Sequence, residues 1–237
     1  MAVKVRGKRY QESAKLVPTN PVTLPQAMVA LKQFKKAKFD ETVNLCIHLG
    51  IDAKQADQMI RGSVSLPKGI GKTNRVIAFT QGNNIDAAKA AGAIEAGADD
   101  LIKKVSDGWM DFDVAIATPD MMSKVSRLGK VLGPQGKMPS PKAGTVTPDV
   151  VTAVREYAAG KIEFRNDAGG NVHVAIGKMS FSDADLVANA AAFVQTLKRL
   201  KPPSAKGHYL KKITIHGSMS PGIQVDVLHL SGTEEEK

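Results

Sequence analysis

The chain shows two kinds of hydrophobic pattern, and the first is found toward both ends. Apolar side chains recur at helical spacing in residues 24–34 (LPQAMVALKQF), whereas in residues 43–49 (VNLCIHL) they alternate with polar ones. The first spacing predicts a helix, and the second predicts a strand with one buried side and one side facing water. Residues 59–66 form another predicted strand, which Pro67 stops.

The middle of the chain shows the second kind of pattern. Residues 75–80 (RVIAFT) and 112–120 (FDVAIATPD) are short and almost wholly apolar, and helical spacing is found in residues 85–98, 121–131 and 148–159. Short apolar strands that alternate with helices are typical of βαβ units around a parallel sheet covered on both faces.

Toward the C-terminus the alternating pattern returns. Residues 161–178 predict a hairpin that turns at NDAGG (166–170), and residues 183–200 predict a helix with Ser182 as its N-cap. Two further alternating runs flank the turn SMSPG at residues 218–222 and predict a second strand pair.

The two termini show no pattern of this kind. The first 20 residues are basic and lack periodicity, which predicts an arm that orders only against a partner. Residues 232–237 (GTEEEK) are polar and acidic, and we expect them to be disordered.

These patterns predict two domains of different class, one inserted in the other. Residues 1–68 and 160–237 would form a discontinuous α+β domain, and residues 69–159 an inserted, Rossmann-like α/β domain. The two chain crossings would lie at glycines, and we expect these to form a hinge: Gly69, Gly71 and Gly160.

Charge supports this division and narrows the class of partner. The net charge is +10, of which residues 69–159 hold only +1 and the flanking residues +9. Such an excess favours a polyanionic partner, either nucleic acid or a membrane surface. No run reaches the roughly 20 apolar residues of a membrane span, and the N-terminus lacks the apolar core of a signal peptide. We therefore expect a cytoplasmic protein without a membrane partner.

Motifs for catalysis or cofactor binding are weak. Cys46 is the only cysteine, and the five histidines show no metal-ligand spacing. KGIGKT at residues 68–73 lacks the glycine that a phosphate-binding loop needs at position 66, and it precedes a predicted strand where that loop precedes a helix. We expect no cofactor, no metal, no small-molecule substrate and no enzymatic activity.

Two rival hypotheses belong to other classes. An α/β enzyme for a small phosphorylated substrate is supported only by the analogy of the central fold. A basic DNA-binding protein needs an element that fits the major groove, and no helix-turn-helix or basic-zipper pattern is found. The Gly/Pro-rich loop at residues 133–145 either contacts a second partner or only joins two elements, and we favour the second interpretation.

Two motifs suit RNA. In KKAKFDET (35–42), lysines can neutralise phosphates while Phe39 interrupts the charge, and a ring in such a place can pack on sugar or base. In SMSPG, small residues permit close approach to the backbone, and Met219 offers a deformable apolar contact. Phe39 and Met219 can equally belong to the core, and the residues alone leave both explanations open.

Seven stretches together resemble the L-one family of large-subunit ribosomal proteins, in family order and over nearly the whole chain. They are KFDETVNLCIHLGID, QMIRGSVSLPKGIGK, DGWMDFDVAIATPDMM, LGKVLGPQGKMPSPKAGTVTPDV, KIEFRNDAGGNVHVAIGKMSF, NAAAFVQTLKRLKPPSAKGHYLKKI and SMSPG. The resemblance implies a ribosomal constituent whose discontinuous domain binds large-subunit rRNA. It also implies a mobile stalk near the exit site, help in the release of deacylated tRNA, and repression of translation through the leader of the protein's own mRNA.

The resemblance also implies the residues of the RNA-binding surface. These are Lys36, Lys38, Phe39, Thr42, Arg165, His173, Lys178, Ser218, Met219 and Gly222. Phe39 and Met219 should then lie on one RNA-facing patch. The last turn departs from the family's usual Thr-Met-Gly-Pro-Gly, because Ser220 stands where that turn has its first glycine. We expect Ser220 to have a negative φ, since a residue with a Cβ is disfavoured at positive φ.

Overall fold

The computed structural model describes residues 7–227, which form a mixed α/β structure of two compact units. The first unit comprises the residues up to 60, residues 66–71 and the residues from 164 onward, and the second comprises residues 61–65 and 72–163. The domain bounds expected at residues 69 and 160 stay a prediction.

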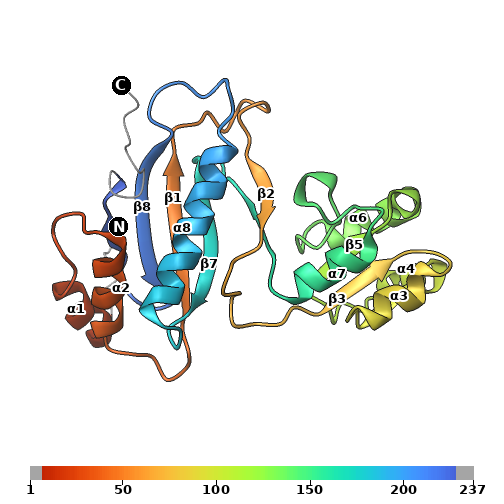
Figure 1. Ribbon diagram of the computed structural model, residues 1–237, viewed down its shortest axis with the longest axis horizontal. Coiled ribbons are helices and arrows are strands. Elements are labelled where there is room, and N and C mark those ends of the chain that lie inside the picture. The colour runs from red at the N-terminus through yellow and green to blue at the C-terminus, as the bar shows by residue number, and fades with distance from the viewer. Residues whose placement is uncertain (1–6, 228–237) are drawn as a thin grey trace. The chain divides into compact units, whose positions relative to one another are not determined.

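The first unit is built on a four-stranded antiparallel sheet in the order β7-β1-β8-β9. The strands are β1 (Thr42–Leu49), β7 (Asn171–Lys178), β8 (Leu210–Gly217) and β9 (Ile223–Val225). Helices α2 (Leu24–Gln33) and α8 (Asp183–Arg199) pack on each other and on the sheet, and Figure 1 shows α8 lying along β1 and β7. The apolar residues of β1 are buried and the polar ones are partly exposed, so the predicted half-buried strand is confirmed.

Local sequence signals explain where the two helices begin and end. Thr23 caps α2 in a capping box with Gln26, and Pro25 occupies its first turn. Ser182 caps α8, because its Oγ accepts a hydrogen bond from the backbone N–H of Asp185 at 3.1 Å. Both predicted helices are confirmed.

The prediction of an unstructured basic arm at residues 1–20 is wrong for part of that stretch. Residues 8–15 form helix α1 (Lys8–Lys15), while residues 1–6 lie outside the described residues. Arg9 lies 3.8 Å from the Glu41 carboxylate, and Glu12 lies 3.4 Å from Lys35. The helix carries charges toward the segment after α2 and lacks a broad apolar stripe, which is why hydrophobic periodicity did not predict it.

The second unit contains a three-stranded parallel sheet in the order β4-β3-β5. The strands are β3 (Val76–Phe79), β4 (Glu95–Gly97) and β5 (Val114–Ala117). Ile77 and Phe79 pack on one face of the sheet, and Val76 and Ala78 on the other, so that each face has its own core. The helices are α3 (Asn84–Ala90), α4 (Asp99–Ser106), α5 (Met122–Val125), α6 (Gly129–Leu132) and α7 (Val150–Ala158). The predicted parallel sheet covered on both faces is confirmed.

Two predicted helices of this unit are too long. The helix expected at residues 85–98 ends at Ala90, and residues 95–97 form β4, which pairs with β3. Gly92 has φ 110°, which a helix does not accommodate, so pairing with β3 overrides the helix propensity of the alanines. The helix expected at residues 121–131 is broken into α5, α6 and the short 3₁₀ turns η1 (Pro119–Met121) and η2 (Ser126–Leu128). Helix α4 was not predicted.

The hairpin predicted at residues 161–178 is wrong. Strand β6 (Ile162–Arg165) pairs with β2 (Arg61–Val64) in a separate two-stranded sheet, whereas β7 pairs with β1. A single bridge between Asn166 and Val172 is what remains of the expected hairpin. The turn is closed by Asp167, whose Oδ1 accepts hydrogen bonds from two backbone N–H groups and thereby lowers the pKa of this carboxyl.

A buried asparagine ties the first predicted hinge segment to the first unit. The Oδ1 of Asn189 in α8 accepts a hydrogen bond from the Lys68 N–H at 3.0 Å, and its Nδ2 donates to the carbonyls of Gly69 at 2.9 Å and Ile176 at 2.8 Å. Asn189 is fully buried and its bond to the Ile176 carbonyl is buried as well, so its amide depends on these three backbone groups for partners.

We therefore expect Asn189→Leu to lower the free energy of unfolding by about 2–4 kcal/mol, because the buried Ile176 carbonyl and two partly buried backbone groups lose their partner. Urea denaturation measures this, with Asn84→Leu on the exposed start of α3 as the control. A stability equal to that of the unmodified protein would contradict the role assigned to these hydrogen bonds.

Candidate nucleic-acid interface

The first unit presents one polar sheet face. On β1 this face carries Thr42, Asn44, Cys46 and His48, all partly exposed. The antiparallel register places His173 of β7 and Thr214 of β8 beside Cys46. The face therefore offers hydroxyl, amide and imidazole groups along its whole length, and lysines lie at its ends.

Glu41 is the organising residue at the Thr42 end of this face. Its side chain is 6% exposed. One carboxylate oxygen accepts a hydrogen bond from the Ala37 N–H at 3.1 Å, and the other accepts one from the Met219 N–H at 3.0 Å. The Glu41 carbonyl also accepts from the Met179 N–H at 2.9 Å. Glu41 thus joins its own loop to two segments that are far away in sequence, to the Met219 turn through its carboxylate and to Met179 through its carbonyl.

Thr42 and Ser218 strengthen this junction. The Thr42 N–H donates to the Ser218 hydroxyl, which in turn donates to the Thr42 carbonyl, both at 3.3 Å. The Lys178 ammonium donates to the Thr42 hydroxyl at 2.8 Å, since these two residues lie opposite each other in the sheet register. Three of the predicted site residues, Thr42, Lys178 and Ser218, are therefore in direct contact.

Both large apolar side chains of the two motifs are exposed beside this junction. Phe39 is 56% exposed and Met219 is 54% exposed, so neither belongs to the core. Phe39 lines a pocket of about 300 Å³ together with Lys36, Met179 and Ser180. Met219 and the loop that holds Phe39 are linked through Glu41. This resolves the alternative that the sequence left open in favour of surface positions.

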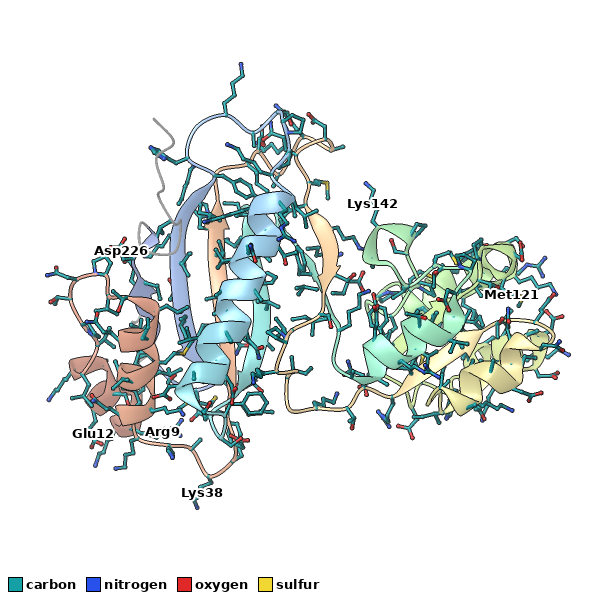
Figure 2. All side chains as sticks on the ribbon, viewed as in Figure 1. Arg9, Glu12, Lys38, Met121, Lys142 and Asp226 are labelled. Atoms are coloured by element: carbon teal, nitrogen blue, oxygen red, sulfur yellow. The ribbon has the colours of Figure 1, made fainter. Side chains whose placement is uncertain are left out.

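Lysines surround the exposed ring. Lys36 and Lys38 are exposed in the loop that follows α2, and Figure 2 shows Lys38 pointing away from the fold at that loop. Lys35 is also exposed and is held at 3.4 Å from Glu12. Cationic and apolar groups that share a surface suit the phosphates and bases of RNA.

The small residues of the last turn have an intramolecular explanation. A Cβ on Gly217 would lie 2.8 Å from a Glu41 oxygen, and a Cβ on Gly222 would lie 2.7 Å from Thr214. Ser220 has a negative φ, as expected, and its Oγ accepts a hydrogen bond from the Gly217 N–H at 2.7 Å. The serine thus closes the turn with its own side chain.

Two predicted site residues lie apart from this edge. His173 is exposed as the third residue of β7, about 16 Å along the strand from Lys178 at roughly 3.3 Å per residue. Its Nε2 lies 3.6 Å from an Asp167 oxygen. Arg165 is exposed on β6, which pairs with β2 and not with the four-stranded sheet.

The next two observations concern metal binding and membrane spanning within the described residues. Among residues 7–227, no three His, Cys, Asp or Glu side chains gather in a way that would hold a metal ion. Within the same residues, no helix has both the length and the apolar character to cross a bilayer.

The missed residue is Glu41. It lies next to Thr42 in KFDET, and its burial could not be read from hydrophobic periodicity because it is acidic. The one available signal was its place between a basic loop and a strand whose apolar residues are buried.

A basic chain with an open polar sheet, exposed apolar side chains and lysines at one edge has the features of a nucleic-acid-binding protein of the α/β class. Comparison with known families gives a narrower result. The family described as "Ribosomal protein L1p/L10e family" matches residues 31–221, and the chain belongs to this family. The chain is also similar to the large ribosomal subunit protein uL1 of Nocardioides sp. (strain ATCC BAA-499 / JS614), at 52% identity over 222 residues, which cover 93% of this chain and 92% of the relative. The resemblance drawn from the sequence is confirmed.

Proposed function

We propose that this protein is a structural constituent of the large ribosomal subunit and that it binds large-subunit rRNA through the Thr42 edge of its first unit. The observation that carries the proposal is the exposure of Phe39 and Met219 on either side of the buried Glu41 carboxylate. Exposed apolar side chains at fixed positions favour a macromolecular partner, and the lysines around them favour RNA.

The division of labour within the proposed site follows from chemistry. Lys36, Lys38 and Lys178 would neutralise phosphates, which supplies affinity without sequence preference. Thr42 and Ser218 would hydrogen-bond to ribose hydroxyls, and Phe39 and Met219 would pack on sugar and base. His173 and Arg165 would contact the same RNA farther from the edge. The exposed backbone of Gly222 would contact the RNA at the turn.

The finer functions of the family form the second part of the proposal. The protein would form a mobile stalk near the exit site of the ribosome, assist the release of deacylated tRNA, and repress translation by binding the leader of its own mRNA. Gly71 and Gly160 adopt φ angles of 70° and 103°, which few other residues tolerate, and the backbone freedom of glycine favours a hinge at these positions. Since Asn189 holds Gly69, any rotation on this side would begin after Gly69.

Salt dependence tests the phosphate contacts. Three lysine–phosphate contacts should make the logarithm of the binding constant fall by about 2 or more per tenfold rise in salt, and Lys38→Gln should reduce that slope by about 0.7–0.9. Filter binding of a large-subunit rRNA fragment at several salt concentrations measures both. Lys54→Gln, at an exposed lysine just after the far end of β1, is the matched control and should leave the slope unchanged.

Double-stranded DNA is the competitor that separates this proposal from general binding to nucleic acids. Because recognition would depend on folded RNA, a DNA duplex should displace the fragment poorly. Efficient displacement by the duplex, or a slope close to zero, would count against rRNA as the partner.

A further inference from the structure

A second basic feature lies at the opposite end of the sheet from Met219. A pocket of about 560 Å³ opens where α8 ends and β8 begins. Its lining includes Lys201, His208, Tyr209, Leu210, Lys211 and Val227. Strand β8 separates it from the Met219 turn by about 23 Å, at roughly 3.3 Å per residue. The pocket is therefore not part of the candidate interface described above.

The charge around this pocket is strongly one-sided. Residues 198–212 (KRLKPPSAKGHYLKK) contain six Lys or Arg residues and one His but no Asp or Glu. Within residues 7–227, neither Lys201 nor Lys211 forms an ion pair. Such a concentration of like charge calls for an acidic counterpart.

The pocket also has an apolar wall. Tyr209 is 7% exposed, and burial raises its pKa to about 12. Its hydroxyl has no hydrogen-bond partner within the described residues. Leu210, Val227 and the aliphatic stems of the lysines extend this wall. The occupant that fits is thus apolar at one end and acidic at the other.

We propose that this occupant is the protein's own C-terminal segment, residues 228–237 (LHLSGTEEEK). The segment follows Val227 directly, and Val227 lines the pocket. Leu228 and Leu230 match the apolar wall, and the three glutamates that follow match Lys201 and Lys211 in charge. The seven steps along the chain from Val227 to Glu234 span up to about 23 Å when extended, which is enough to cross a pocket of this size.

Attachment to the same chain makes this contact favourable even though each ion pair is weak. Each exposed ion pair contributes little free energy, but a tether of a few residues holds the acidic groups at millimolar effective concentration or higher. The contact is reversible and weakens with salt. It neutralises the basic stretch farthest from the Met219 turn and directs RNA phosphates toward the candidate interface, which raises specificity.

Carbodiimide crosslinking of the full-length protein at low salt, without RNA, tests the contact directly. This reagent joins carboxylates to amines that touch, and mass spectrometry identifies the pairs. We expect Glu234, Glu235 or Glu236 to be joined to Lys201 or Lys211, with loss of these products at high salt. Equal joining to Lys89 and Lys142, exposed lysines of the second unit, would overturn the proposal. Since RNA is absent, the outcome is independent of the proposed function.

A charge-neutral tail tests the consequence. The triple variant Glu234→Gln, Glu235→Gln and Glu236→Gln should bind oligouridylate about three- to tenfold more tightly at low salt, because polyanions gain access to the pocket lysines. Adding Lys201→Gln and Lys211→Gln should abolish this gain. The effect of the two lysine changes must also be measured with the natural tail. If they weaken RNA binding as much with the natural tail as with the neutral tail, the pocket is an RNA surface and the proposal is overturned. No gain in the triple variant would overturn it as well.

Discussion

Replacing Met219 by aspartate should lower the affinity for a large-subunit rRNA fragment more than tenfold. The methionine is 54% exposed at the tip of the turn, so a carboxylate there meets no steric obstacle within the protein. It would instead place a negative charge against RNA phosphates and remove the deformable apolar contact. Filter binding measures the affinity, and circular dichroism establishes that the fold is retained.

Met59→Asp is the matched control for this experiment. Met59 is 56% exposed in the same unit, and it lies just before β2, in the segment that follows the end of β1 opposite to Thr42. Met59→Asp changes the net charge by the same amount as Met219→Asp. The affinity of the Met59→Asp variant for the RNA should therefore fall by only the small factor that the change in net charge causes. Equal losses in the two variants, or no loss in Met219→Asp, would show that Met219 does not contact the RNA.

Replacing Glu41 by alanine should destabilise the first unit by about 2–3 kcal/mol, because hydrogen bonds to a charged acceptor are lost at a buried site. The N–H groups of Ala37 and Met219 both lose their acceptor. We also expect weaker RNA binding, since the segments that carry Phe39 and Met219 would no longer be held together. Urea denaturation measures the loss of stability. Amide hydrogen exchange measures whether these two N–H groups lose their protection.

Glu12→Ala is the control for the loss of an acidic residue. Glu12 forms an ion pair with Lys35 in which both side chains are mostly exposed, so its removal should change stability by less than about 1 kcal/mol. Glu41→Gln should fall between the two, because the amide keeps one acceptor oxygen. A Glu41→Ala variant as stable as the Glu12→Ala variant would show that the buried carboxylate does not hold the edge together.

Sequence patterns predicted those elements whose burial repeats at a regular spacing. The alternation in VNLCIHL corresponds to β1, and LPQAMVALKQF corresponds to α2, because one face of each element must be apolar. The errors occur where partners are distant. Residues 162–165 and 171–178 look like a hairpin but pair with β2 and β1, and local sequence does not encode that choice.

The candidate site was likewise predicted in part from the sequence and in part decided by the fold. KFDET and SMSPG were identified from their chemistry, but exposure of Phe39 and Met219 was undecided, since a large apolar residue in a turn can face either way. The structure decides it through Glu41 and Met219, which are 178 positions apart in the chain yet 3.0 Å apart at oxygen and nitrogen. Arg165 and His173, which the prediction placed in one hairpin, lie on different sheets in the structure.

By itself, the sequence determined the regular elements with clear periodicity, the concentration of positive charge in the flanking segments and membership of a ribosomal protein family. These properties depend on residues that are close in the chain or on composition. Only the tertiary structure decided which strands pair, which apolar side chains stay exposed to water, and which acidic residue is buried between the segments that carry them. Those outcomes depend on contacts between distant segments, because a backbone N–H takes whichever acceptor the completed fold brings within reach.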